Sequence, residues 1–257
     1  MRVGFIGLGT IARGVLELLQ PADRIDIVGA LVAHPNKLRP DCHVHLCTRI
    51  EDLLALKPEV VVEVAGHAAL RCHGPTVLRA GIDLLILAVG ALAEPDTERA
   101  IREAARAGNS RAIIVSGGIG GLDAIASASA GQLNRVTHIT RKPARALLPP
   151  EEAAALQEPR ELFAGSAREG ALKFPESINV AAAVSLAGLG LDRTQVRVTA
   201  DPTLDRNRHE VIAEGDFGRF RFEIENVPSA DNPRTGRLVA MSVAQALRRR
   251  QARLIIG

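Results

Sequence analysis

The first fourteen residues, MRVGFIGLGTIARG, constrain the fold more than any other part of the chain. An apolar run, Val3–Ile6, leads into the motif Gly7-x-Gly9-x-x-Ala12, and an apolar helical pattern follows it. In a strand that turns tightly into a helix, the first glycine permits the turn, the second lets a pyrophosphate approach the backbone, and the third small residue packs helix on strand. Free N–H groups at the helix start attract the phosphates. The motif predicts a dinucleotide site, although a strand–helix turn without a ligand uses the same residues.

Apolar runs alternate with helical patterns through the first half of the chain. Strands are expected at Val3–Ile6, Ile27–Val32, Val60–Glu63, Leu84–Leu87 and Ile113–Val115. Helices are expected at Ala12–Leu19, Ile50–Leu56, Leu70–Ala80, Pro95–Ala107 and Leu122–Ala130. Continuous apolar strands that alternate with helices indicate a parallel sheet covered on both faces. We therefore predict an α/β fold with a Rossmann-type dinucleotide-binding domain, residues 1–121.

The pattern changes after Gly131 and predicts a smaller, antiparallel-leaning α+β substrate domain, residues 122–231. Its expected strands are Thr137–Thr140, Val196–Ala200 and the hairpin His209–Glu214 with Gly218–Glu225, and its expected helices are Pro150–Leu156 and Ile178–Ala187. The spacing of apolar residues over Thr235–Arg250 predicts one long amphipathic helix. We expect this C-terminal helix to return to the first domain, with residues 232–257.

Composition disfavours nucleic-acid binding. The chain has 257 residues with six Phe and no Trp or Tyr, whereas single-stranded nucleic-acid binders use aromatic stacking platforms. The net charge is only +3. The basic run Arg248–Arg250, with Arg253, lies late in a helical pattern, where cations complement the helix C-terminus. We expect no nucleic-acid partner.

Cysteine count and hydropathy indicate the compartment. Three Cys, an odd number, do not make a disulfide framework and favour a reducing compartment. The first residues show no apolar segment of a secretory signal. No apolar run reaches about 18 residues, the length that spans a bilayer. We expect a cytoplasmic protein with no membrane partner.

The end of the second expected strand bears on the type of cofactor. NAD sites usually place Asp or Glu there to hold the ribose 2′-OH, but here the strand runs into Ala33 and His34. His34, Lys37 or Arg39 can instead accept the 2′-phosphate of NADP, or they are solvated loop charges. NAD and NADP both stay open.

A group of Cys and His follows this strand. In Cys42-His43-x-His45-x-Cys47, alternate side chains share one face of a strand. Cys72-His73 would be the further metal ligands from outside this group. The spacing matches no usual zinc-ligand pair. We prefer a polar edge strand and expect no metal.

Three further segments carry candidate chemistry. Ser116–Gly121 follows the fifth expected strand and Glu63–His67 the third, at the carboxyl ends where open α/β sheets bind ligands. The glycines of Ser116–Gly121 also suit an interdomain hinge. His209 starts the hairpin, and histidine is the natural general base near neutral pH, although a lone histidine is more often structural.

In this order and spacing, the segments resemble the NAD(P)-dependent L-aspartate dehydrogenases, a family close in plan to homoserine dehydrogenase and dihydrodipicolinate reductase. The resemblance covers nearly the whole chain. The segments that carry it are Gly7–Ala12, Glu63–His67, Val89–Leu92, Ser116–Ala124, Arg141–Pro143, Phe174–Ala182, Asn207–Glu210 and Asn232–Thr235.

The resemblance implies roles for individual residues. His209 matches the active-site histidine, and Asn179 a contact on the nicotinamide side of the cofactor. The family's Ser-Gly-Ala-Ile-Gly segment here has Gly118 in place of Ala, and a backbone contact survives that change. Lys142 is the first candidate for a substrate carboxylate, because Lys and Arg bind carboxylates strongly, and His67 is a weaker one. A solvated loop charge is the alternative for Lys142. The full set expected to bind the cofactor is Gly7, Gly9, Thr10, Ile11, Ala12, His34, Gly118, Asn179 and Asn232.

The implied reaction is oxidative deamination of L-aspartate through iminoaspartate to oxaloacetate and ammonia, or its reverse. A base must take a proton from the amine before hydride leaves Cα, and His209 can serve. The family also implies a homodimer built through the second domain, and iminoaspartate would suit NAD biosynthesis. The alternatives are a reductase of the homoserine dehydrogenase or dihydrodipicolinate reductase type, and a non-catalytic NAD(P)-binding regulator.

Overall fold

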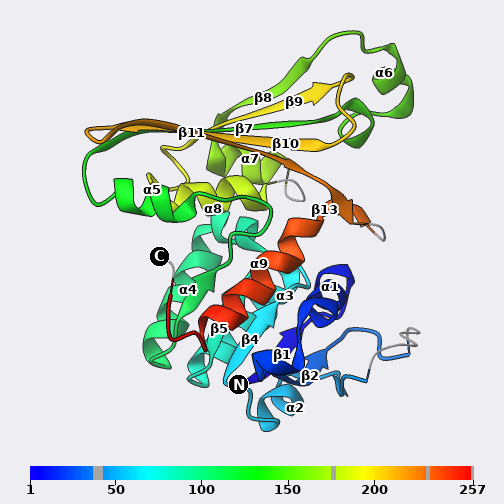
Figure 1. Cartoon of the computed structure of the whole chain (residues 1–257), viewed down its shortest axis with the longest axis vertical. Coiled ribbons are helices and arrows are strands. Elements are labelled where there is room, and N and C mark those ends of the chain that lie inside the picture. Colours follow the sequence, from blue (N-terminus) through cyan, green and yellow to red (C-terminus); the bar gives the residue numbers. More distant parts are fainter. Residues whose placement is uncertain (37–42, 175–177, 230–231, 256–257) are drawn as a thin grey trace. The chain divides into compact units, whose positions relative to one another are not determined.

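The chain divides into two units, each with its own sheet (Figure 1). Unit 1 consists of Met1–Val115 and Ala240–Ile256, and unit 2 of Ser116–Val239. The structure is a computed structural model that describes residues 1–36, 43–174, 178–229 and 232–255.

Unit 1 is built on a parallel sheet of six strands in the order β3-β2-β1-β4-β5-β6. The strands are β1 (Arg2–Ile6), β2 (Asp26–Leu31), β3 (Leu46–Cys47), β4 (Val60–Glu63), β5 (Asp83–Ile86) and β6 (Ala112–Ile114). All four residues of β4 and of β5 are buried, as in strands covered on both faces. The Rossmann-type parallel sheet is confirmed.

The Cys and His group lies around the short edge strand β3. Cys47 is buried, and Cys42 lies outside the described residues. Among the residues that the structure describes, no cluster of three or more His, Cys, Asp or Glu could hold a metal ion.

The helices of unit 1 are amphipathic, as the sequence pattern predicts. They are α1 (Thr10–Leu18), α2 (Ile50–Ala55), α3 (His67–Arg79) and α4 (Pro95–Ala107), with the 3-10 turns η1 (Pro21–Asp23) and η2 (Val89–Ala93). In α4, Thr97, Ile101 and Ala104 form the buried stripe. A Cβ on Gly74 of α3 would come within 2.9 Å of Ile101 Cδ1, so a small residue there lets α3 and α4 pack closely.

The last helix, α9 (Arg237–Arg249), belongs to unit 1 from Ala240 onward. Arg248 donates to both carboxylate oxygens of Asp23, at 2.8 and 2.9 Å, and to the Leu18 carbonyl at 2.7 Å. Arg250 donates to Asp83 at 2.7 Å. Two arginines of the basic run therefore pair with acids inside unit 1.

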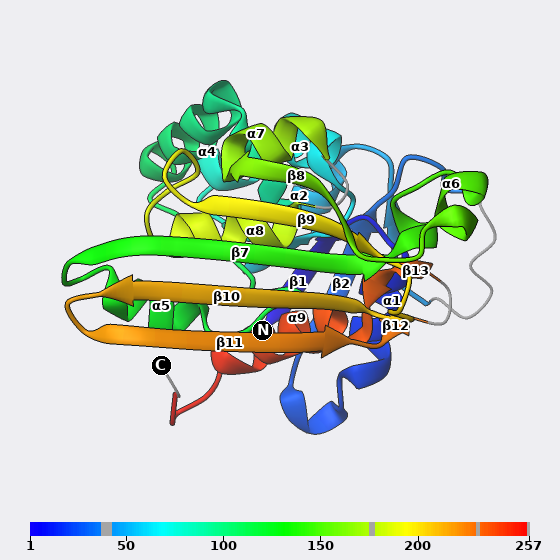
Figure 2. The same cartoon turned by 90° about the horizontal axis from the view of Figure 1, so that it is seen from above.

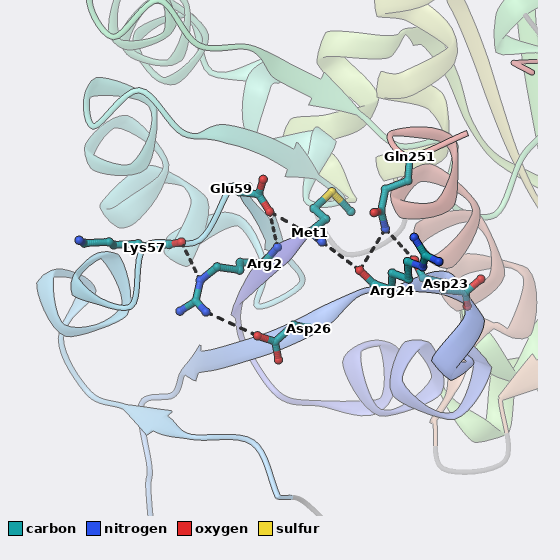
Figure 3. Close-up of polar contacts among 8 residues, drawn as sticks. All are labelled: Met1, Arg2, Asp23, Arg24, Asp26, Lys57, Glu59 and Gln251. Atoms are coloured by element: carbon teal, nitrogen blue, oxygen red, sulfur yellow. Dashed lines mark hydrogen bonds and ion pairs between the residues drawn. The ribbon is translucent and has the colours of Figure 1, made fainter. Parts of the chain in front are cut away.

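Polar contacts also join the segments at the amino end of this sheet (Figure 3). The Met1 amino group donates to the Arg24 carbonyl at 2.9 Å, and Arg2 Nε donates to the Lys57 carbonyl at 3.2 Å. Gln251, just after α9, donates to the Asp23 and Arg24 carbonyls. The amino ends of these strands are thus joined by internal contacts, whereas the loops predicted to bind ligands follow the carboxyl ends.

Unit 2 contains a five-stranded sheet in the order β11-β10-β7-β9-β8 (Figure 2). Its strands are β7 (Leu133–Pro143), β8 (Arg160–Ser166), β9 (Gln195–Asp201), β10 (Asn207–Gly215) and β11 (Gly218–Asn226), beside a small pair of β12 (Pro228–Ser229) and β13 (Asn232–Gly236). The sheet is mixed, because β7 and β9 run parallel while the other pairs are antiparallel.

Helices cover one face of the unit 2 sheet (Figure 2). They are α5 (Leu122–Ala128), α7 (Ala167–Lys173) and α8 (Asn179–Ala187); the turn η3 (Ala144–Ala146) and helix α6 (Pro150–Ala155) follow β7. Ile125 of α5, Val184 of α8 and Val136 of β7 are among the fully buried residues of this core.

Strand β8, helix α7 and the small pair of β12 and β13 are absent from the sequence prediction. Strand β8 is half-exposed and charged at its start, and its apolar pattern is weak. Ser166 and Glu169 form a capping box at the start of α7, and this S-x-x-E spacing is a signal that the sequence does contain.

Among the described residues, no helix is long and apolar enough to cross a membrane.

Candidate active site

The turn between β1 and α1 leaves the start of the helix open to an anion. Gly7 has φ +95°, and a Cβ there would come within 2.9 Å of Ala65 Cβ, so this turn requires glycine. A Cβ on Gly9, the N-cap residue, would meet nothing within 4 Å. Gly9 supplies no side-chain cap, and the first turn of α1 holds no acidic residue. The first N–H groups of α1 therefore suit a pyrophosphate.

The other residues of unit 1 that are predicted to bind the cofactor differ in how deeply they are buried. Ala12 is fully buried, which fits its packing role, and Thr10 and Ile11 are half-buried. His34 is exposed beyond the carboxyl end of β2. Lys37 and Arg39 lie outside the described residues.

A buried carboxylate organises the loops at the carboxyl edge of this sheet. Glu63, the last residue of β4, is fully buried. Its Oε1 accepts from the N–H groups of Ala65 and Gly66 at 2.8 and 2.7 Å, and its Oε2 accepts from Ala88 N–H at 2.9 Å. Burial raises the pKa of Glu63, while these backbone donors oppose the rise. Glu63 thus joins the β4–α3 loop to the segment after β5.

His67 lies at the end of the loop that Glu63 holds. It is the first residue of α3 and half-buried, and it follows Gly66, whose φ is +103°. It therefore lies beyond the carboxyl end of β4, where a ligand is predicted, and its contact with substrate stays a prediction.

Unit 2 brings two histidines together through the pairing of β7 with β10. His209 lies opposite Thr140 in the antiparallel register. Because side chains alternate along a strand, His138, Thr140 and Lys142 share the face that His209 occupies. Thr140 Oγ1 lies 3.1 Å from His209 Nδ1 and 3.3 Å from His138 Nε2. The two imidazole rings stack at 5.5 Å between centroids and 13° between planes.

Burial determines the proton affinity of both histidines. His138 is 1% exposed and His209 6%, and their cross-strand neighbours include Val196, Val198 opposite Thr140, and Ile224. Burial lowers the pKa of His138 to about 3, and the charge of Lys142 acts in the same direction. Burial also lowers the pKa of His209 well below its usual value, with smaller contributions from His138 and Lys142. Both rings are therefore neutral at neutral pH.

Lys142 is a strand residue rather than a loop residue. It lies in β7, half-buried, and pairs with Ala200 of β9. The solvated-loop interpretation is therefore wrong. Its charge acts on both His138 and His209, which places a cation on the histidine face of the sheet.

The glycine-rich segment is tied to the same unit. The Asn226 amide, at the end of β11, donates to the Gly118 carbonyl at 2.8 Å. A Cβ on Gly118 would lie 3.8 Å from Cγ2 of Val180 in α8, and Asn179 is the first residue of that helix. Asn232 opens β13, where it pairs with Ser229.

The sequence prediction omits three residues of this site: His138, Thr140 and Asn226. The signal for the first two is the alternation His138-x-Thr140-x-Lys142, which places all three on one face of a strand. Asn226 offers no comparable signal, because its partner Gly118 is 108 residues away.

Comparison with known protein families shows the class of protein to which unit 1 belongs. Residues 7–115 match the family described as "Homoserine dehydrogenase, NAD binding domain". With the open helix start after β1, unit 1 is therefore a Rossmann-type domain of a nicotinamide-dinucleotide oxidoreductase.

The second unit and the relatives narrow the class to one family. Residues 123–250 match the family described as "Aspartate dehydrogenase, C-terminal". The chain is 41% identical to the L-aspartate dehydrogenase of Ruegeria pomeroyi, over 98% of this chain and 93% of that protein. It is 40% identical to that of Pseudomonas aeruginosa, over 96% of each. The chain belongs to the L-aspartate dehydrogenase family.

Solved structures agree on the fold. The crystal structure of aspartate dehydrogenase from Thermotoga maritima superposes with a TM-score of 0.83 at 24% identity, covering 100% of this chain and 99% of that chain. A hyperthermophilic archaeal homoserine dehydrogenase in complex with NADPH gives 0.62 at 12% identity, covering 96% of both chains.

Proposed function

We propose that the protein oxidises L-aspartate with NAD or NADP and water to oxaloacetate and ammonia, and catalyses the reverse reaction. The observation that carries the proposal is a buried, neutral histidine, His209, beside a cation on the sheet of unit 2 in a chain of this family. The glycine turn before α1, with Gly7 and Gly9, would hold the pyrophosphate.

The bound cofactor would accept a hydride from Cα of the substrate. This step requires a neutral amine, so a base must first remove a proton from the substrate ammonium. His209 Nδ1 lies beside Thr140, which leaves Nε2 for that proton. The two substrate carboxylates would raise the pKa of His209 on binding and so make it a stronger base.

The same histidine would assist the second half of the reaction. Once His209 has passed its first proton to solvent, water adds to the iminium carbon of protonated iminoaspartate and His209 would take the proton of that water. His209 would return this proton to the carbinolamine nitrogen, and collapse then releases ammonia and leaves the ketone of oxaloacetate. Lys142 on β7 would bind one substrate carboxylate.

The cofactor contacts and the choice between NAD and NADP belong to the same proposal. Asn179, Gly118 and Asn232 would contact the cofactor on the side of unit 2, and Thr10 and Ile11 with the glycine turn on the side of unit 1. His34 stands where NAD sites usually place a carboxylate. We propose that both cofactors are accepted, and comparing their kcat/KM values tests this.

The enzyme assay follows nicotinamide absorbance with oxaloacetate, ammonium and NADH or NADPH. We expect cofactor oxidation only when ammonium is present. Oxidation without ammonium would indicate reduction of the ketone instead, and cofactor binding without turnover would indicate a regulator. Turnover of aspartate semialdehyde alone would favour a homoserine dehydrogenase type.

The His209→Ala variant tests the base. It should fold and bind NADPH as the wild type does, and kcat should fall about 100-fold or more, the usual contribution of general acid–base catalysis. Near-full kcat would remove His209 from the mechanism.

We further propose that the protein works in the cytoplasm as a homodimer joined through the unit 2 sheet. The face turned away from the helices carries half-buried Ile139 and Ile212, with Glu210 opposite Ile139 and Thr137 opposite Ile212. Sedimentation should give a dimer for the wild type and a monomer for Ile212→Glu.

A further inference from the structure

The proposed base, His209, and two buried side chains behind it form one hydrogen-bonded row. Thr140 Oγ1 stands between His138 Nε2 at 3.3 Å and His209 Nδ1 at 3.1 Å. His138 is 1% exposed, Thr140 2% and His209 6%. Water therefore has little access to these hydrogen bonds, and the side chains must satisfy one another.

We propose that Thr140 and His138 are positioning residues that couple the tautomer of His209 to the tautomer of His138. In this relay, His209 offers a lone pair at Nε2 only when His138 carries its proton on Nδ1. The proposal deepens the function proposed above and rests on it for the role of His209 as the base.

The number of hydrogens in the row explains why the tautomers of the two histidines are coupled. A threonine hydroxyl has one hydrogen and two lone pairs, so it can donate to only one ring. Among the described residues the hydrogen-bond partners of buried Thr140 Oγ1 are these two rings, so its hydrogen goes to one ring and it accepts from the other. If it donates to His138 Nε2, it accepts from His209 Nδ1–H, and both rings carry their proton on Nδ1. If it donates to His209 Nδ1, both rings carry their proton on Nε2. Two neutral rings bridged in this way therefore share one tautomer.

Only the first arrangement serves catalysis. There Nε2 of His209 is bare and can take the substrate proton; the imidazolium then keeps donating Nδ1–H to Thr140. In the second arrangement, Nε2 already bears a proton and the base is lost. The substrate ammonium is a donor only, so its binding at Nε2 selects the first arrangement.

His138 suits the far end of this relay because it does not become charged. Burial and the charge of Lys142 lower its pKa to about 3. Lys142 and the two histidines themselves are the ionisable groups that act on the pair. The cross-strand neighbours from β9 and β11 are the apolar Val196, Val198 and Ile224.

The remaining ring nitrogen of His138, Nδ1, is buried and makes no hydrogen bond to a described residue. In the catalytic arrangement this atom bears a hydrogen, and in the other a lone pair. Since neither is satisfied by a side chain, the two arrangements stay close in energy, and a bound substrate can choose between them.

Nitrogen NMR of the full chain with 15N-labelled histidine tests the coupling directly. In the ligand-free wild type at neutral pH, both rings should show the same tautomer. In the dead-end complex with NADH and L-aspartate, both should carry the proton on Nδ1. Thr140→Ser should behave as the wild type. In Thr140→Val, the ligand should alter His209 alone. Opposite tautomers in the wild type, or retained coupling in Thr140→Val, would overturn the proposal.

Kinetics supply the second readout. Thr140→Val should lower kcat about 10- to 100-fold, part of what a general base contributes, while KM for the cofactor stays unchanged and Thr140→Ser restores activity. His138→Gln, which keeps an acceptor for Thr140, should retain more activity than His138→Leu. Equal loss in both members of each pair would refute positioning. If the wild type shows no ammonia-dependent turnover, the proposed function fails, whereas the ligand-free spectrum still tests the relay.

Discussion

At the scale of single residues, burial sets the protonation state of the two histidines of unit 2. His138 and His209 are ordinary imidazoles that are buried and whose row is flanked by apolar residues of β9 and β11. Loss of solvation disfavours the charged form, so both stay neutral in the folded chain. That neutrality is what lets one ring act as a base and the other as an acceptor.

The same burial predicts how stability depends on pH. In the unfolded chain His138 takes a proton near pH 6.5, whereas folded His138 does so only near pH 3. Acid therefore favours the unfolded state, and the contribution is lost as pH falls below 6.5. Between pH 7 and pH 5 the free energy of unfolding should fall by about 2 kcal/mol through His138.

Denaturant titration of the wild type and His138→Leu at both pH values measures this contribution. The variant should lose less stability on acidification than the wild type, whatever its stability at pH 7. An equal pH dependence in the two proteins would show that His138 is solvated or already charged.

At the scale of elements, loops at the ends of strands depend on a few contacts. Glu63 holds the loop after β4 and the segment after β5, and Asn226 holds the glycine-rich segment beside α8. Because loops pack less tightly than strands, losing one such contact can displace a ligand-binding backbone without unfolding the sheet.

Glu63→Gln tests the first contact. The amide would turn an N–H group toward the backbone donors that the carboxylate now accepts from, leaving one unsatisfied. We expect the free energy of unfolding to fall by about 1–3 kcal/mol and KM for the cofactor to rise. Glu59→Gln is the matched control, because Glu59 precedes the same strand and its side chain is 62% exposed. An unchanged KM in Glu63→Gln would argue against its role at the cofactor edge.

Two glycines of one segment should respond differently to alanine. At Gly118 a Cβ would meet Asn226 Nδ2 at 3.6 Å, an ordinary contact, whereas at Gly120 it would come within 2.8 Å of the Phe222 ring. Gly118→Ala should therefore keep activity and gain about 0.4–1 kcal/mol from a less flexible unfolded chain. Gly120→Ala should lose about 1–3 kcal/mol from overpacking. Thermal unfolding of the pair measures both, and a stability loss in Gly118→Ala would contradict the geometry.

At the scale of the whole molecule, the last helix returns the chain to its first sheet. Arg248 binds Asp23 through two hydrogen bonds, and Arg250 binds Asp83, which also pairs with Arg111. These contacts join residues more than 160 positions apart within unit 1. The helix is thus a structural part of unit 1.

Arg248→Leu should accordingly lower the melting temperature, because Asp23 and the Leu18 carbonyl lose their donor. Arg249→Leu is the control, because Arg249 is exposed and surface changes away from such contacts are usually small. Equal melting temperatures for the two variants would mean that the Arg248–Asp23 pair adds nothing to stability.

The sequence by itself determined the glycine turn and the alternation of parallel strands with helices, because glycine spacing and hydrophobic period are local properties of the chain. The order and spacing of its motifs determined the family. The weakly patterned β8, the strand position of Lys142 and the partners of His209 were decided only by the tertiary structure. His209 meets Thr140 across 69 residues, and no local pattern encodes which residues of two strands face each other. The register of β7 against β10 decides it, because a shift of one residue would turn the histidine to the other face.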